Sequence, residues 1–209
     1  MNKGFFITFE GGEGSGKSTQ ANLLYKRLLK NGHEAIITRE PGGSEGAEII
    51  RELLVNGKVD RWEPLSELFL FSAARIDHIT KTIAPALTDG KIVICDRYVD
   101  STSAYQEIGG NIDKNIVNAI QDLTVNKLYP NLTYVCDLDP KIGLDRALNR
   151  NITENRFELK GLEFHLKIRN AFIQIANKNK NRCVIVNSNR DIDEISIDIF
   201  NHFVLTYKN

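Results

Sequence analysis

The sequence predicts an α/β fold that is organised around a parallel β-sheet. About five short apolar runs alternate along the chain with longer stretches in which apolar residues recur at helical spacing. Strands that alternate with helices form parallel sheets whose two faces are both covered. A glycine-rich segment with the pattern G-x-x-x-x-G-K-[ST] follows the first apolar run and precedes the first helical stretch.

The apolar runs give the expected strands, and the stretches with helical spacing give the expected helices. The apolar runs are residues 5–9, 34–38, 91–95, 132–138 and 183–187. The helix after the glycine-rich segment has Ala21, Leu24 and Leu28 on one face. Further helices are expected over residues 44–55, from about 64, over 116–123, after Pro140, over 162–175 and from 192. No repeat or linker-like stretch interrupts the chain, so we expect one domain over residues 1–209.

The helix that begins near residue 64 is expected to bend or end near Ala84, because Pro85 lacks a backbone N–H and clashes with the preceding turn. Its buried stripe is expected to contain Leu65, Leu68, Phe69, Ser72, Ile76, Ile79 and Ile83. Phe71, Arg75 and His78 share a neighbouring face. Phe71 and Arg75 can stack on and hydrogen-bond to a heterocycle, or form a core ring beside a surface ion pair. His78 is expected to be exposed.

The composition limits the classes of function. Hydrophobic residues make up 42% of the 209 residues, and the 27 basic residues balance the 27 acidic ones. A net charge of zero argues against a general nucleic-acid binder, which usually carries a basic excess. The sequence has no apolar run of membrane-spanning length and no secretory signal, so we expect a cytoplasmic protein. Cys95, Cys136 and Cys183 lie in apolar runs without metal-ligand spacing, and we expect them to be buried thiols.

The glycine-rich segment has the residue types that a phosphate chain requires. It consists of Gly11, Gly12, Glu13, Gly14, Ser15, Gly16, Lys17 and Ser18, followed by Thr19. Glycines let the backbone fold around phosphates with its N–H groups inward, and the helix that follows adds the positive end of its dipole. Lys17 is expected to reach the β- and γ-phosphates, and the Ser18 hydroxyl to bind Mg²⁺. The alternative is a plain turn between a strand and a helix.

Two more strands end in residues that suit an anion site. Arg39 follows the second apolar run, and Asp96 and Arg97 follow the third. In open α/β sheets, ligands bind at the carboxyl ends of the strands. An aspartate there can hold Mg²⁺ and an arginine can bind phosphate. The alternatives are a solvated surface arginine at Arg39 and a structural ion pair between Asp96 and Arg97.

A polar stretch over residues 150–158 interrupts the helical pattern and carries Arg150 and Arg156. It is expected to be either a surface loop or a mobile lid over the site.

Taken together, these motifs resemble those of thymidylate kinases over essentially the whole chain. The resemblance rests on F-E-G before the glycine-rich loop, T-R-E-P-G-G at residues 38–43, Phe71 to Arg75, D-R-Y at 96–98 and A-Y-Q at 104–106. It implies a nucleoside-monophosphate-kinase-like three-layer α/β/α sandwich with a phosphate-binding loop. It also implies a reaction in which ATP and dTMP give dTDP and ADP with Mg²⁺.

The resemblance assigns roles to individual residues. Arg39 and Arg97 bind the dTMP phosphate, Phe71 stacks on thymine, and Arg75 donates to its O4. Glu13 approaches the sugar 3′-hydroxyl, Tyr105 lies near C2′, and Gln106 helps to fix the base. Arg146 lies against adenine, together with the backbone of residues 187–190.

The loop itself contains no arginine, so the resemblance favours the bacterial type, in which lid arginines supply charge to the transferred phosphoryl group. Arg150 and Arg156 are the lid residues available for that role. The resemblance also suggests a homodimer, for which the helices after Pro64 and Ser101 offer apolar surface.

Two other readings of the sequence stay open. The first is a kinase for another nucleoside monophosphate or small acceptor, because an aromatic–arginine pair favours a pyrimidine without proving thymine. The second is a nucleotide-binding switch without turnover. The GTPase motifs D-x-x-G and N-K-x-D do not occur in the sequence, which argues against the switch.

Overall fold

The computed structural model describes residues 4–149 and 156–207 and contains a five-stranded sheet in which all the pairings are parallel. The strands are β1 (Phe5–Glu10), β2 (Ala35–Arg39), β3 (Ile92–Asp96), β4 (Leu132–Asp137) and β5 (Cys183–Asn187). Their order across the sheet is β2-β3-β1-β4-β5. The parallel sheet predicted from the alternating periodicities is therefore confirmed.

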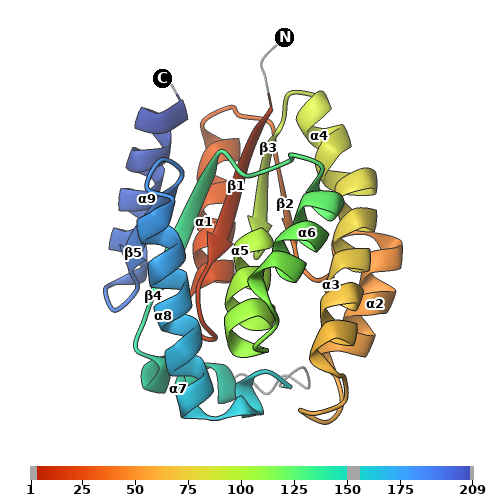
Figure 1. Cartoon of the computed structure of the whole chain (residues 1–209). Coiled ribbons are helices and arrows are strands. Elements are labelled where there is room, and N and C mark those ends of the chain that lie inside the picture. The colour runs from red at the N-terminus through yellow and green to blue at the C-terminus, as the bar shows by residue number, and fades with distance from the viewer. Residues whose placement is uncertain (1–3, 150–155, 208–209) are drawn as a thin grey trace.

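The strand order creates a crevice beside β1. The chain leaves β1 toward β2 and β3 on one side, and later crosses to β4 and β5 on the other. The register aligns Phe9 with Asp96 and Asp96 with Arg39, so the residues that follow these strands meet at one edge. The start of β1 and the end of α9 lie at the opposite end of the molecule (Figure 1).

The helices separate the strands along the chain. They are α1 (Lys17–Lys30), α2 (Glu45–Val55), α3 (Pro64–His78), α4 (Ala84–Thr88), α5 (Val99–Thr102), α6 (Lys114–Val125), α7 (Pro140–Leu148), α8 (Leu162–Lys178) and α9 (Ile192–Tyr207). Two π-helical turns, Ile79–Ile83 and Ser103–Gly109, join α3 to α4 and extend α5.

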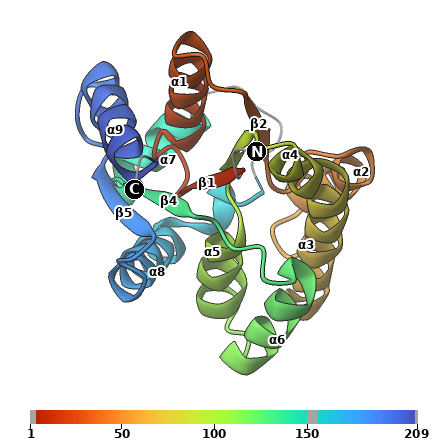
Figure 2. The same cartoon turned by 90° about the horizontal axis from the view of Figure 1, so that it is seen from above.

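The sheet is the middle of three layers. Helices α1 and α9 cover one face, and α5 and α8 lie on the other (Figure 2). Alternation along β1 divides the core, because Ile7 and Phe9 pack with α1 and α9 while Phe6 packs on the opposite side. The three cysteines are buried and unpaired, as expected from their apolar runs. No helix within the described ranges is long and apolar enough to span a bilayer.

Two expectations for the helix that begins at Pro64 need correction. It does not end near Ala84, which was one of the two outcomes expected from Pro85, because the π-helical turn Ile79–Ile83 carries it into α4, where Pro85 lies in the first turn and its missing N–H costs little. Three of the seven residues of the expected buried stripe are exposed: Leu65, Phe69 and Ile76 are 45%, 56% and 45% exposed, whereas Leu68, Ser72 and Ile83 are buried as expected.

The face of α3 that points inward carries charged and polar residues beside the buried Leu68. Glu67, Arg75 and His78 are all buried. Their tertiary partners make this possible, because a buried charge is tolerated only where it is paired and hydrogen-bonded. Helical spacing therefore located the helix correctly but assigned part of its apolar face to the wrong side.

Candidate active site

Many of the predicted site residues line one cavity of about 280 Å³ at the carboxyl ends of the strands. Its lining includes Glu13, Gly14, Lys17, Ser18, Arg39, Phe71, Arg75, Asp96, Arg97, Tyr105, Gln106 and Arg156. These residues come from segments that are far apart in the sequence. The sheet register explains their convergence, because β1, β2 and β3 all end at this edge.

The glycine-rich loop folds back on itself around Lys17. The Lys17 ammonium donates to the Gly12 carbonyl at 2.6 Å and lies 3.4 Å from the Ser15 hydroxyl. Burial, and after it the charge of Arg97, lowers the pKa of Lys17 below its ordinary value. A bound phosphate would supply a negative charge close to this buried ammonium, whose hydrogen-bond partners are the Gly12 carbonyl and the Ser15 hydroxyl.

The tip of the loop packs against the backbone of α7. Gly14 has a φ of +66°, and a Cβ built on it would lie 1.9 Å from the Gly143 carbonyl oxygen. A Cβ on Gly143 would in turn lie 2.3 Å from the Glu13 carbonyl oxygen. Glycine is therefore required at both Gly14 and Gly143, and the close contact with α7 fixes the position of the glycine-rich loop.

Asp96 and Ser18 meet where β3 ends and α1 begins. The Ser18 hydroxyl donates to one carboxylate oxygen of Asp96. The other oxygen, Oδ1, is buried and has no hydrogen-bond partner among the described residues. An unpaired buried carboxylate oxygen beside a hydroxyl is a suitable ligand set for a hard cation such as Mg²⁺.

Arg97 is held in a strained turn that directs its guanidinium into the cavity. Its φ is +70°, which is uncommon for a residue with a side chain. The guanidinium donates to the Gly11 carbonyl at 3.1 Å, the Ser101 hydroxyl at 3.2 Å and a Glu13 carboxylate oxygen at 3.1 Å. It also lies over the Tyr105 ring, 5.0 Å from its centroid. Arg97 is therefore positioned before any substrate binds.

Glu13 connects this arginine to Tyr105, whose hydroxyl donates to the other Glu13 oxygen. Burial alone would raise the pKa of Glu13, but the positive charges of Arg97 and Lys17 lower it below its ordinary value. Glu13 is therefore a carboxylate that can accept a hydrogen bond from a hydroxyl group in the cavity.

The turn that holds Arg97 is fixed by Glu10, a residue that the sequence interpretation did not single out. The fully buried Glu10 carboxylate accepts the backbone N–H groups of Tyr98 at 2.7 Å and Ser101 at 3.3 Å, and the Ser101 hydroxyl at 2.6 Å. Its position immediately before the glycine-rich loop was the only available signal.

Arg75 is buried and engages three partners. It donates to Glu40 Oε2 at 2.7 Å, to the Thr102 hydroxyl at 2.8 Å and to the Tyr98 carbonyl at 3.0 Å. The surface ion pair considered from the sequence is thus a buried one. His78, which we expected to be exposed, is fully buried and contacts the same Glu40 at 3.2 Å. Glu40 lies inside the T-R-E-P-G-G stretch, but its partners on α3 are set only by the fold.

Phe71 and Gln106 line the part of the cavity that is bounded by α3 and the π-helical turn Ser103–Gly109. The Phe71 ring lies 6.1 Å from the ring of Phe157, which in turn packs edge-on against Tyr105 at 5.8 Å. Gln106 is buried and donates through Nε2 to Glu67 Oε1 at 3.1 Å. Phe157 and Glu67 were not identified from the sequence.

Not all of the predicted basic residues point into the cavity. The Arg39 side chain lies at its exposed rim and pairs with Glu48 at 3.0 Å. Arg146 is exposed on α7 and does not line the cavity. Arg150 lies outside the described residues. The Arg156 guanidinium is buried and pairs with Glu67 at 2.6 Å, so a role at the phosphoryl group would require it to leave that position.

The fold and the cavity define a phosphate-loop enzyme of the nucleoside-monophosphate-kinase type. A glycine-rich loop faces a second pocket that carries buried arginines and an aromatic ring. This is the arrangement required to bring a nucleotide phosphate chain toward a second anionic acceptor.

Comparisons with known proteins identify the acceptor. The family model for thymidylate kinase matches residues 9–199. The thymidylate kinase of Caulobacter vibrioides is 48% identical over 95% of this chain and 95% of its own length. The enzyme of Ruegeria pomeroyi is 45% identical over 99% and 97% of the two chains. The crystal structure of thymidylate kinase from Ehrlichia chaffeensis has a TM-score of 0.77 at 35% identity and covers 96% of this chain and 99% of its own.

The chain therefore belongs to the thymidylate kinase family. It is an enzyme that phosphorylates dTMP to dTDP, with dTMP and ATP as its substrates.

Glu10 is expected to make folding stability depend on pH. Burial, and then the charge of Asp100, raises its pKa from 4.5 to about 8. The folded protein then holds a proton that the unfolded chain releases, and this stabilisation is lost as the pH rises from about 4.5 to 8. Glu10→Gln mimics the protonated acid and does not titrate. As the pH rises through that range, the free energy of unfolding of the variant minus that of the wild type should therefore increase by up to about 1.4 kcal/mol per pH unit.

Urea unfolding at a series of pH values between 5 and 8.5 measures this difference. Glu34→Gln, at an exposed carboxylate, is the control and should follow the wild type at every pH. A constant difference between Glu10→Gln and the wild type would show that Glu10 is ionised in the folded protein throughout.

Gly143→Ala tests the contact between α7 and the loop. At an uncrowded position inside a helix, this change would stabilise the folded protein by about 0.5–1 kcal/mol. Here the new methyl group meets the Glu13 carbonyl, so we expect the loop to shift and the affinity for ATP to fall about 10-fold. Calorimetric titration with ATP provides the measurement, and Lys141→Ala on the exposed side of α7 should leave the affinity unchanged. Normal ATP binding by a stabilised Gly143→Ala protein would contradict the argument.

Proposed function

We propose that the two substrates of this thymidylate kinase approach each other across the cavity, with ATP on the glycine-rich loop and dTMP between α3 and the π-helical turn. The observation that carries this proposal is the convergence of Lys17, Arg97, Phe71 and Gln106 on one cavity. Residues 11–19 would hold the ATP phosphates through backbone N–H groups, the Lys17 ammonium and the start of α1.

The dTMP site would divide into a phosphate end and a base end. Arg97 and Arg39 would bind the phosphate, with Glu13 at the 3′-hydroxyl and Tyr105 beside C2′. Support for the sugar assignment comes from the hydrogen bond between the Tyr105 hydroxyl and Glu13, which places the carboxylate and the aromatic ring side by side in the cavity lining. At the base end, Phe71 would stack on thymine, while Arg75 and Gln106 would face its polar edge.

Mg²⁺ fits the residues at the end of β3. Ser18 and Asp96 would hold it, and the phosphates and waters would complete its preferred oxygen shell. No cluster of three or more potential metal ligands of the His, Cys, Asp or Glu type occurs in the part of the chain that the structure describes. A bound Mg²⁺ ion neutralises phosphate charge during phosphoryl transfer.

The chemistry requires positioning rather than a strong base. The second ionisation of a phosphate monoester has a pKa near about 6, so the attacking oxygen of dTMP is largely deprotonated at neutral pH. The main barrier is repulsion between two anions, which Lys17, Arg97 and Arg39 would offset by placing positive charge on both sides.

The remaining assignments concern the lid and the adenine end. We propose the lid-arginine subtype because the loop offers only Lys17 as a charged donor. Arg150 and Arg156 stay the lid residues available for that role, although Arg156 is buried against Glu67 in this structure. Arg146 on α7 and the exposed residues after β5 would flank adenine. A cytoplasmic location also stays a prediction, in keeping with the nucleotide metabolism of the family.

A homodimer would explain the exposed apolar residues on α3 and α6. Leu65, Phe69 and Ile76 on α3, and Ile116 and Leu123 on α6, are each at least 45% exposed. The two helices lie side by side, away from α1 and α9 (Figure 2). Several large apolar side chains exposed on two adjacent helices are typical of an interaction site, and a C₂ pairing would bury them against their counterparts.

Phe71→Ala tests the pocket assignment. Loss of base stacking should raise the dissociation constant for dTMP about 10- to 100-fold, because stacking on an aromatic ring contributes about 1–3 kcal/mol. The affinity for ATP should stay within about twofold of the wild type. Calorimetric titrations with each nucleotide measure both, with Phe200→Ala on α9 as the control for loss of a partly buried ring. Weakened ATP binding with normal dTMP binding would mean that the two pockets are reversed.

Phe69→Glu tests the dimer. A charge in the centre of an apolar interface should shift the protein from dimer to monomer at micromolar concentration. Light scattering after size-exclusion chromatography gives the mass directly. Leu29→Glu, at a similarly exposed apolar residue on α1, should not change the mass. A wild-type protein that is monomeric in this assay would disprove the dimer.

A further inference from the structure

Glu67 is a buried carboxylate that joins two parts of the proposed base pocket. It lies in the first turn of α3 and is 6% exposed. One carboxylate oxygen pairs with the Arg156 guanidinium at 2.6 Å, and the other accepts from Gln106 Nε2 at 3.1 Å. Neither partner belongs to the phosphate-binding loop, and the mechanism proposed above gives Glu67 no role.

The Arg156 guanidinium, which pairs with one oxygen of the Glu67 carboxylate, is itself fixed by further hydrogen bonds. Besides Glu67, the guanidinium donates to the carbonyl oxygens of Leu54, Lys58 and Val59 at 3.0–3.1 Å. These carbonyls belong to the end of α2 and the connection after it, where the negative end of a helix dipole favours a cation. A cation with four acceptors around it will keep an oxygen, not an N–H group, as its partner on α3.

The contact with Gln106 determines which end of the Gln106 amide can face the base. A carboxylate is an acceptor only, so the amide must turn its NH₂ group toward Glu67. The amide oxygen is then the group that Gln106 can present to the cavity, which it lines. The N3 position of thymine carries an N–H donor, whereas N3 of cytosine is an acceptor.

We propose that Glu67 determines base specificity indirectly, by fixing the orientation of the Gln106 amide so that the pocket accepts a base N–H and rejects a base lone pair. Glu67 is thus a positioning residue that does not touch the substrate. The inference rests on the proposed placement of the thymine base against Gln106 and extends it to the discrimination of dTMP from dCMP.

The variant Glu67→Gln gives a directional test. Arg156 requires an oxygen, so the new amide should turn its oxygen to Arg156 and its NH₂ group to Gln106. Gln106 must then offer its own oxygen to residue 67 and its NH₂ group to the cavity. We expect dTMP affinity to fall about 10- to 100-fold while dCMP affinity is retained or increases, so the preference for dTMP falls by at least that factor.

The double variant Glu67→Gln/Gln106→Glu is the rescue. It exchanges the carboxylate and the amide, so residue 106 again presents an acceptor to the base whichever way it turns. The preference for dTMP over dCMP should return toward the wild-type value. A merely structural role for Glu67 predicts no such recovery, because the double variant leaves Arg156 without its carboxylate as the single variant does.

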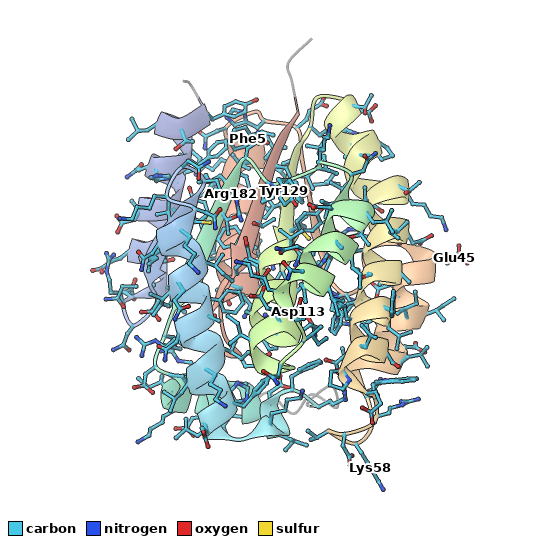
Figure 3. All side chains as sticks on the ribbon, viewed as in Figure 1. Phe5, Glu45, Lys58, Asp113, Tyr129 and Arg182 are labelled. Carbon is cyan, nitrogen blue, oxygen red and sulfur yellow. The ribbon has the colours of Figure 1, made fainter. Side chains whose placement is uncertain are left out.

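Arg182→Gln is the matched control for loss of a buried ion pair. Arg182 pairs with Asp100 at 2.7 Å, and it lies far from the Lys58 end of the molecule (Figure 3). Its loss should lower the melting temperature and leave the ratio of dTMP to dCMP affinity unchanged. Each variant is measured by calorimetric titration with dTMP, dCMP and ATP and by thermal unfolding, so that affinity and stability are separated.

The outcomes distinguish this inference from the base assignment on which it rests. Gln106→Leu should weaken dTMP binding, and normal dTMP binding by that variant would overturn the placement of the base itself. If Gln106→Leu weakens binding but Glu67→Gln keeps the wild-type affinity ratio, or the double variant fails to restore it, the orienting role of Glu67 is overturned. A fall in the ratio for Glu67→Gln with recovery in the double variant supports it.

Discussion

The need to hold positive charge in place before an anion arrives governs much of this structure. A guanidinium that waits in a half-buried cavity must have a counter-charge, since an unpaired buried cation is costly. Arg97 has Glu13, Arg75 has Glu40 and Arg156 has Glu67. Each carboxylate fixes an orientation as well as neutralising a charge, so the site is preorganised.

This pairing has consequences for the fold. The inward face of α3 carries Glu67, Arg75 and His78 where an ordinary amphipathic helix would carry apolar side chains. The apolar residues Leu65, Phe69 and Ile76 lie exposed on the outer face. The inward side of α3 contributes Phe71 and Arg75 to the cavity lining, and the proposed dimer would use the outer side.

The sequence predicted those features that depend on local pattern. Short apolar runs located all five strands, and the glycine-rich pattern correctly placed a loop between β1 and α1, where a phosphate site stays a prediction. The end-of-strand residues Arg39, Asp96 and Arg97 could be brought together in advance because parallel strands end at one edge. The partners of the arginines could not be predicted in the same way. Glu67 and Arg156 are separated by 89 positions, and no local spacing relates them.

The role of Glu10 depends both on its position in the sequence and on contacts that only the fold creates. Its place before the loop is a matter of sequence, but its function depends on the turn at Tyr98 to Ser101, which reaches it only across the sheet. That turn keeps Arg97 at a positive φ, a conformation that a residue with a side chain adopts only when its surroundings impose it. A buried acid that holds two backbone N–H groups imposes it without contacting a substrate. Glu10 toward Arg97 and Glu67 toward Gln106 thus follow one rule, in which a carboxylate behind the site determines what the residue in front of it can bind.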